Sequence, residues 1–215
     1  MADRLVVVSG GGTGIGKEIA TAFAAVDRVV ILGRRTEVLD KARAEIGESR
    51  VVAIPADLTD PEQVRKACDQ IIAMGSVDVL VNNAGANVTT LADDSLAAVA
   101  DAWHRDLDTN LLTAVLLTSA LINHLRRPGG RLIMISSTAA QRGGSGIHSA
   151  GSYAAAKAGL HGWAFGLDCC GRTLCGDHPE LGTGQPHQST DLAEHALHHS
   201  RPDLHEFARL ARSTA

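Results

Sequence analysis

The sequence has little of what marks several classes of protein. Its 215 residues include only four cysteines and 3% aromatic residues, and its 20 Lys and Arg are outnumbered by 24 Asp and Glu. Three of the cysteines crowd together at Cys169, Cys170 and Cys175, a spacing that does not suggest a disulfide framework. A net charge of −4 argues against a nucleic-acid or anionic-membrane surface, which requires a basic stripe.

Long apolar segments are also missing. A membrane span needs roughly 18 apolar residues, and the best run, Leu111–Ile122, is interrupted by Thr113, Thr118 and Ser119. The chain enters Leu5–Val8 without a secretory apolar region. These absences argue against a membrane bundle or a secreted mini-protein, and they predict a cytoplasmic protein with no membrane or nucleic-acid partner. The 45% hydrophobic content suits one globular domain.

Short runs rich in Val and Ile alternate with longer segments of helical spacing. We expect strands at Leu5–Ser9, Arg28–Leu32, Arg50–Ile54, Val77–Val81 and Arg131–Ser136. We expect helices near Gly14–Ala25, Glu37–Ile46, Pro61–Ala73, Ala102–Leu125 and Ser152–Leu167. Such alternation is typical of parallel βαβ units, and strands that are apolar throughout are typical of a sheet covered on both faces. The sequence therefore predicts an α/β fold, a doubly wound parallel sheet with about five recognisable strands.

The third expected helix has a readable start. Asp60 is placed as its N-cap, Pro61 occupies the first helical position, and Gln63 completes a capping-box pattern.

The last 48 residues, 168–215, differ in composition from the rest of the chain. They contain no Val and no Ile, whereas residues 1–167 contain 27, and they hold six of the ten histidines. Because β-branched residues favour strands, we expect no strand after Ser137 and a tail that is poorly ordered or forms short helices. The predicted organisation is a domain at residues 1–167 followed by this atypical tail.

A glycine-rich turn follows the first expected strand and leads directly into a helix. Its sequence is Ser9-Gly10-Gly11-Gly12-Thr13-Gly14-Ile15-Gly16-Lys17. Glycines allow close backbone approach, and the N–H groups of such a turn can surround an anion, ideally a pyrophosphate. A flexible loop is the alternative, which the flanking strand and helix disfavour.

The end of the second strand bears on which nucleotide fits. An NAD site usually has a carboxylate here to hold the ribose 2′-hydroxyl, but this chain has Gly33, Arg34 and Arg35. Two guanidinium groups suit the 2′-phosphate of NADP(H). The pattern therefore favours NADP(H) over NAD(H), with an exposed basic turn at a helix start as the alternative.

Tyr153 and Lys157 stand four residues apart in an expected helix, which places both side chains on one face. A phenol has an ordinary pKa near 10 and exchanges protons poorly at neutral pH, but a neighbouring ammonium favours the phenolate. The chain has one tyrosine and four lysines, so this spacing is uncommon by chance. The pair predicts proton exchange with an alcohol or ketone oxygen; an exposed polar pair is the alternative.

Several ordered motifs over about residues 5–167 resemble the classical short-chain dehydrogenase/reductase family, which implies a Rossmann-like sheet. Ser9-Gly10-x-x-x-Gly14-x-Gly16 resembles the family's glycine motif, with Ser in place of the usual Thr. Ala56-Asp57-Leu58 resembles the segment that contacts the adenine, and Asn82-Asn83-Ala84-Gly85 matches the NNAG motif that lines the cofactor cleft. The family's C-terminal strands are not recognisable in residues 168–215.

The resemblance implies roles for four catalytic residues. Tyr153 exchanges the proton, while Lys157 favours the phenolate and holds the nicotinamide ribose. Ser137, the second of the Ser136-Ser137 pair, hydrogen-bonds the substrate carbonyl oxygen. Asn110 holds a helix kink and a relay water. Strand-end capping by Ser137 and simple backbone hydrogen bonding by Asn110 are the alternatives.

The expected activity is NADP(H)-dependent interconversion of a ketone and a secondary alcohol, with a resemblance to 3-oxoacyl-carrier-protein reductases. The substrate stays open among β-ketoacyl groups, sugars, steroids and small diketones, and the family resemblance implies a homodimer or homotetramer. The predicted cofactor-binding residues are Ser9, Gly10, Gly12, Thr13, Gly14, Ile15, Gly16, Arg34, Arg35, Asp57, Leu58, Asn83, Ala84, Gly85, Tyr153 and Lys157.

Two features of the tail, its histidine spacing and its composition, bear on function. His195, His198 and His199 have a spacing that can chelate zinc, but no carboxylate or cysteine is clearly placed to complete a site, so no metal is predicted. The atypical composition of 168–215 also supports an alternative hypothesis, in which the chain is a truncated or frame-shifted, inactive nucleotide-binding domain whose nicotinamide pocket lacks one wall and cannot enclose substrate.

Overall fold

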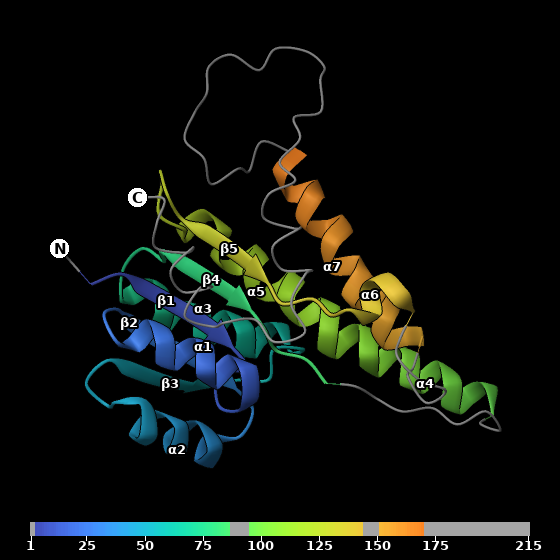
Figure 1. The fold of residues 1–215 in the computed structure, drawn as a ribbon, viewed down its shortest axis with the longest axis horizontal. Coiled ribbons are helices and arrows are strands. Elements are labelled where there is room, and N and C mark those ends of the chain that lie inside the picture. Colours follow the sequence, from blue (N-terminus) through green and yellow to red (C-terminus); the bar gives the residue numbers. More distant parts are fainter. Residues whose placement is uncertain (1–2, 87–94, 144–150, 170–215) are drawn as a thin grey trace, which may run out of the picture.

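One parallel sheet organises the computed structural model, which describes residues 3–86, 95–143 and 151–169 (Figure 1). Its strand order is β3-β2-β1-β4-β5. The strands are β1 Leu5–Ser9, β2 Arg28–Gly33, β3 Val51–Pro55, β4 Val79–Asn82 and β5 Arg131–Met134. The order runs outward in both directions from β1 and β4, which makes their shared carboxyl ends the switch point where open α/β sheets bind ligands.

Helices flank the sheet on both sides. They are α1 Gly14–Ala24, α2 Thr36–Ile46, α3 Pro61–Ala73, α4 Leu96–Leu107, α5 Thr113–Leu121, α6 Ala139–Arg142 and α7 Gly151–Cys169. The predicted α/β fold with a doubly wound, Rossmann-like parallel sheet is confirmed. In Figure 1, α4 and α7 lie together beyond one end of the strands.

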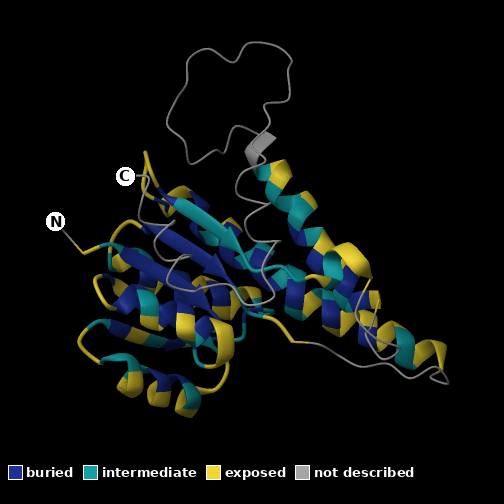
Figure 2. Cartoon of the chain, in the orientation of Figure 1, coloured by how far each residue is buried: buried dark blue, intermediate teal, exposed yellow. Residues whose placement is uncertain are grey.

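The two faces of the sheet carry separate hydrophobic cores. Successive side chains of a strand point to opposite faces, so Leu5 and Val7 pack with α3 and α5, while Val6 and Val8 pack with α1 and α2. Figure 2 shows β1, β2 and β4 buried along nearly their whole length. This double burial explains why these strands read as continuous apolar runs rather than alternating ones.

The fourth expected helix differs most from its prediction. Expected at Ala102–Leu125, it begins at Leu96, where Ser95 Oγ accepts a hydrogen bond from the Ala98 N–H at 3.2 Å. A π-helical turn at Asp108–Leu112 then separates α4 from α5. The segment ends in a short 3-10 turn, Ile122–His124.

Smaller differences occur at strand ends and in one short helix. β4 begins at Val79 rather than Val77, because Val77 forms only an isolated bridge with Leu125. β5 ends at Met134, two residues before the expected end, and the single turn of α6 was not expected. The expectations for the tail fall on residues 170–215, which lie outside the described residues.

Asp78 is a buried side chain at the amino end of β4 that ties three segments together. Its Oδ2 accepts a hydrogen bond from the backbone N–H of Leu5 at 2.8 Å, and the Arg126 guanidinium pairs with both carboxylate oxygens. The charge is therefore compensated where the sheet begins.

Replacing Asp78 by Ala should lower the free energy of unfolding by about 1–3 kcal/mol, because the buried N–H of Leu5 loses its acceptor. Urea denaturation followed by circular dichroism measures this change. Asp69→Ala, on the exposed face of α3, is the control and should leave the transition nearly in place. Coincident transitions for Asp78→Ala and the unmodified chain would show that this contact contributes no stability.

Candidate active site

The glycine-rich turn between β1 and α1 packs directly against the end of β4. Ser9 Oγ accepts hydrogen bonds from the backbone N–H groups of Asn83 and Ala84, both at 2.9 Å, and donates to the Val81 carbonyl at 3.3 Å. The Asn83 side-chain amide donates to the Ser9 carbonyl at 3.0 Å. These contacts hold the two strand ends together and satisfy backbone groups that no strand partner reaches.

Two glycines are required by this close approach. Gly10 has a φ of +66°, and a Cβ there would lie 2.9 Å from the Asn83 side-chain nitrogen. A Cβ on Gly16 would overlap the Gly10 carbonyl oxygen. Within the described residues, Thr13 makes no side-chain capping bond to α1, and the first turn of α1 carries no acidic residue. The helix N-terminus is therefore open to an anion.

A cavity of about 180 Å³ opens beside this turn, at the carboxyl ends of the strands. Several predicted cofactor-binding residues line it: Gly10, Gly12, Thr13, Arg34, Arg35, Asp57, Leu58, Ala84 and Gly85. Ser9, Gly14, Ile15, Gly16 and Asn83 belong to the adjoining turn and strand end without lining it. Sequence reasoning missed other lining residues, among them Val38, Thr59, Ala86, Thr109 and Thr113. Thr109 and Thr113 reach the cavity from the segment of the π-helical turn, which no local signal had placed there.

Arg34 and Arg35 stand at the rim of the cavity, between β2 and α2. Both are exposed, and neither forms an ion pair with another of the described residues. Arg35 immediately precedes α2 in an extended conformation. Two uncompensated guanidinium groups therefore face the part of the cavity that follows β2.

The cavity wall after β3 is braced by the start of α3. The Asp57 carboxylate accepts hydrogen bonds from the N–H and the hydroxyl of Thr59, at 3.0 and 2.8 Å. The Asp57 N–H donates to Gln63 Oε1 at 2.9 Å, while the Gln63 amide nitrogen donates to Asp60 at 2.9 Å. The capping-box glutamine thus serves the cavity-lining turn rather than the N-cap backbone, a role that sequence reasoning missed.

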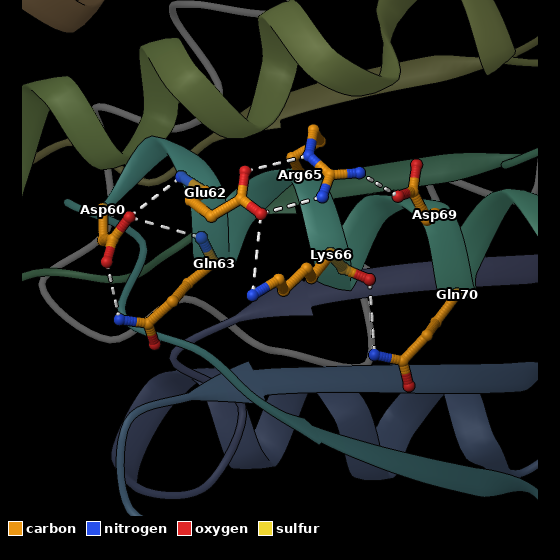
Figure 3. A network of polar contacts seen from close by, with 7 residues as sticks. All are labelled: Asp60, Glu62, Gln63, Arg65, Lys66, Asp69 and Gln70. Atoms are coloured by element: carbon orange, nitrogen blue, oxygen red, sulfur yellow. Dashed lines mark hydrogen bonds and ion pairs between the residues drawn. The ribbon is translucent and has the colours of Figure 1, made fainter.

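Figure 3 shows how this bracing continues along α3. Asp60 accepts hydrogen bonds from the N–H groups of Glu62 and Gln63, and the Gln63 side chain together with these bonds lowers the pKa of Asp60. Hydrogen bonding and charge from Arg65 lower the pKa of Glu62 to about 2. At neutral pH the helix start therefore carries fixed negative charge, which the helix dipole favours.

Tyr153 and Lys157 face each other on α7. The Lys157 Nζ lies 5.9 Å from the centre of the Tyr153 ring and donates to the Ile135 carbonyl at 3.1 Å. The lysine is only 3% exposed, and a Cβ placed on Gly85 would come within 3.1 Å of its Nζ. Burial lowers the pKa of Lys157 to about 8. The ammonium therefore lies between the phenol and the cavity wall.

Asn110 lies buried inside the π-helical turn. Its Oδ1 accepts from the Ala86 N–H at 3.1 Å, and its Nδ2 donates to the Ala86 carbonyl at 2.6 Å and to the Asp106 carbonyl at 3.0 Å. The side chain thus holds the segment after β4 against an irregular helix. Asn110 therefore lies in an irregular stretch of helix, as expected, and it also hydrogen-bonds backbone groups, as the alternative interpretation of this residue holds.

Ser137 lies on the segment after β5. Its Oγ accepts a hydrogen bond from the Ala139 N–H at 3.2 Å, which caps α6. Among the described residues no acceptor engages its hydroxyl proton, so this capping is compatible with donation to a substrate oxygen.

Metal and membrane features are absent from the described part of the chain. No group of three His, Cys, Asp or Glu side chains there is arranged to hold a metal ion, and none of its helices has the length and apolar character of a membrane span. His195, His198 and His199 lie outside the described residues.

The sequence of this chain is similar to those of known proteins of one family. A model of the short chain dehydrogenase family matches residues 4–169, which ends where α7 ends. The chain therefore belongs to the short-chain dehydrogenase family, a family of oxidoreductases that use a nicotinamide cofactor.

Individual relatives agree with this assignment. Meso-2,3-butanediol dehydrogenase of Serratia marcescens is 31% identical over 72% of this chain, and 11-beta-hydroxysteroid dehydrogenase-like 2 of Arabidopsis thaliana is 30% identical over 73%. The crystal structure of a short-chain dehydrogenase from Streptomyces avermitilis superposes with a TM-score of 0.70 at 30% identity over 81% of this chain. The matches cover 60%, 51% and 63% of those proteins, respectively.

The burial of Lys157 predicts how the stability of the folded chain changes with pH. Below pH 8 the side chain is charged in both folded and unfolded states, and the lowered pKa opposes folding by about 3 kcal/mol. Between pH 8 and 10.5 the folded state releases the proton first, so this penalty disappears as the pH rises. Lys157→Met should therefore gain melting temperature relative to the unmodified chain at pH 7, and the gain should shrink by pH 10.

Thermal unfolding at both pH values measures the effect. Lys41→Met, on an exposed position of α2, is the control and should show no such pH dependence. The same melting difference for Lys157→Met at pH 7 and pH 10 would mean that the lysine is not significantly desolvated.

Proposed function

We propose that this chain is an NADP(H)-dependent oxidoreductase that interconverts a ketone and a secondary alcohol. The observation that carries the proposal is the position of Lys157, whose buried Nζ lies against both the Tyr153 ring and the cavity-lining Gly85. The Lys157 ammonium therefore lies beside both the Tyr153 phenol, which would exchange the proton, and the cavity, which would hold the nucleotide. Two of the relatives are named for a butanediol and for a hydroxysteroid, and both of these compounds carry a secondary alcohol.

The residues present fit a dinucleotide. Gly16 leaves space beside the Gly10 carbonyl that any Cβ would fill, and the N-terminus of α1 is open and free of acidic side chains. Asp57 and Leu58 line the opposite part of the cavity, where they would hold the adenine, and Arg34 and Arg35 would pair with a 2′-phosphate. Bound there, the nicotinamide donates or accepts the hydride.

The chain's own groups handle the proton and the substrate oxygen. Tyr153 gives a proton to the ketone oxygen during reduction, or takes one from the alcohol during oxidation. The Lys157 ammonium, beside the Tyr153 ring, would hydrogen-bond the nicotinamide ribose. Ser137 would donate its hydroxyl proton to the same substrate oxygen and stabilise the charge that develops on it. Asn110 would position a relay water through the irregular turn that it holds.

The catalytic and cofactor positions all fall between Ser9 and Lys157, within the domain assigned to residues 1–167. The substrate is a small carbonyl compound or alcohol, such as a β-ketoacyl group, in the manner of 3-oxoacyl-carrier-protein reductases. The protein would act in the cytoplasm as a homodimer or homotetramer.

Tyr153→Phe should reduce turnover by two to three orders of magnitude, since general acid–base catalysis contributes about 10²–10⁴. Nucleotide affinity should change little, because the phenyl ring is kept. Oxidation of NADPH against a panel of ketones, including small diketones and a β-ketoacyl thioester, measures turnover, and quenching of protein fluorescence measures affinity. Near-normal turnover in this variant would remove Tyr153 from its role. An unmodified chain that binds NADPH and turns over no ketone would instead support the inactive nucleotide-binding domain.

The unmodified chain should bind NADPH about tenfold to a hundredfold more tightly than NADH, the range that a charge-assisted contact supplies. Replacing Arg34 and Arg35 together by Ala should remove most of this difference by weakening NADPH binding alone. Titration calorimetry with both nucleotides measures it. Arg43→Ala, at a half-buried position near the end of α2, removes one positive charge away from the cavity and should preserve the preference. Equal affinities in the unmodified chain would show that the two guanidinium groups face only solvent.

A further inference from the structure

A buried hydrogen bond anchors the helix that carries Tyr153. Ser152, the residue directly before Tyr153, is fully buried in the first turn of α7, and its Oγ donates to Asp106 Oδ2 at 2.6 Å. That length is typical of a hydroxyl donating to a charged carboxylate. Asp106 comes from α4 and is fully buried as well. Neither residue belongs to the family motifs found in the sequence.

The contact continues to the cavity wall. Asn110 Nδ2 lies 3.0 Å from the Asp106 carbonyl oxygen and 3.4 Å from its Oδ1. The same Asn110 amide binds both the N–H and the carbonyl of Ala86, which lines the cavity. A continuous path of hydrogen bonds therefore runs from α7 through α4 to the segment after β4.

Tyr153 is thereby held between two anchors on one helix. On one side Ser152 binds Asp106, and on the other Lys157 binds the Ile135 carbonyl while its own carbonyl accepts from Ser136 Oγ at 3.2 Å. Burying a carboxylate costs free energy, and an aliphatic pair of similar volume would pack α4 against α7 without that cost. The directional contacts of Ser152 and Lys157 fix how α7 is rotated about its axis and how far it is shifted along it. Apolar packing alone would fix these two quantities only loosely.

We infer that Asp106 and Ser152 are positioning residues for the proton transfer at Tyr153. They set the first turn of α7 relative to the cofactor cavity, and with it the place of the phenol oxygen. The inference rests on the proposed function for its kinetic consequence, but the position of the Tyr153 side chain is measurable without any reaction.

The kinetic test uses Ser152→Ala, Asp106→Asn and the double variant. The two single variants should lower kcat by about tenfold to a hundredfold, the effect of displacing a catalytic group by about 1 Å. KM for the ketone and the Kd for NADPH should stay within about threefold. Because each single variant already weakens or removes the hydrogen bond between Ser152 and Asp106, the double variant should be no slower than the slower single variant. Asp108→Asn makes the same charge change at an exposed position two residues away and should leave kcat unchanged.

The second readout uses the fact that Tyr153 is the only tyrosine of the chain. Incorporation of 3-fluorotyrosine gives a single fluorine resonance that reports on this ring. The resonance should shift or broaden in Ser152→Ala and in Asp106→Asn, and it should be unchanged in Asp108→Asn. Circular dichroism and melting temperature establish that each variant is folded. If Ser152→Ala does not fold, Asp106→Asn, which keeps the shape and one acceptor, carries the test.

The outcomes separate the possibilities. Folded single variants that keep kcat within twofold, or that leave the fluorine resonance in place, overturn the positioning role; a lowered melting temperature alone then marks a merely structural contact. An unmodified chain that binds NADPH but reduces no ketone contradicts the proposed function, and the fluorine resonance still decides whether Asp106 and Ser152 set the position of Tyr153.

Discussion

The contact between the glycine-rich turn and the end of β4 is the constraint on which the rest of the site depends. Ser9 uses one hydroxyl to bind the N–H groups of Asn83 and Ala84, which no longer have a strand partner. The chain after β4 is therefore held as an extended wall beside the cavity. Gly85, the next residue, then lies so close to Asn110 that a Cβ there would clash with the Asn110 Oδ1, and it would be in tight contact, at 3.1 Å, with the Lys157 Nζ. One strand-end contact thus sets the distance between the cavity and the pair Tyr153 and Lys157.

Most of the fold could be predicted because its signals are local. Continuous apolar runs marked the strands, and Asp60 with Pro61 gave the first turn of α3 without error. The motifs around Gly10 and Asn83 lie beside the cavity, since a strand–turn–helix unit dictates where its backbone N–H groups point. What sequence reasoning missed depends on residues distant along the chain. Nothing next to Ser152 in the sequence indicates its role, because its partner Asp106 is 46 residues away and is brought beside it by α4.

Buried polar groups divide this protein into two regions. Away from the carboxyl ends of the strands, the interior is mostly Val, Leu and Ile packed in two layers, with the buried carboxylates of Asp27 and Asp78 at the edge where the strands begin. Toward those ends Ser9, Asn110, Ser152 and Lys157 are all buried, and each makes hydrogen bonds. Such groups add little stability, but they fix direction, which apolar contacts do not. The interior therefore changes from a region that stabilises the fold to one that orients side chains.

The π-helical turn has a consequence for how the chain length can vary. Buried residues recur every four positions through α4, this turn and α5: Ala102, Asp106, Asn110, Ala114 and Thr118. A regular helix advances about 100° per residue, so positions four apart drift by about 40°, and the series would wind about 160° around the helix. The wider turn at Asp108–Leu112 lags behind a regular helix by about one residue, or about 100°, and so offsets most of this drift. Because this turn holds one residue more than an α-helical turn, deleting one residue there would restore a regular helix and keep the buried side of α5 against the sheet. A deletion inside α4 or α5 would instead swing the helix that follows by about 100°. Insertions and deletions are tolerated in the loops of such a fold, whereas along α4 and α5 the residue count can change by one only at this turn.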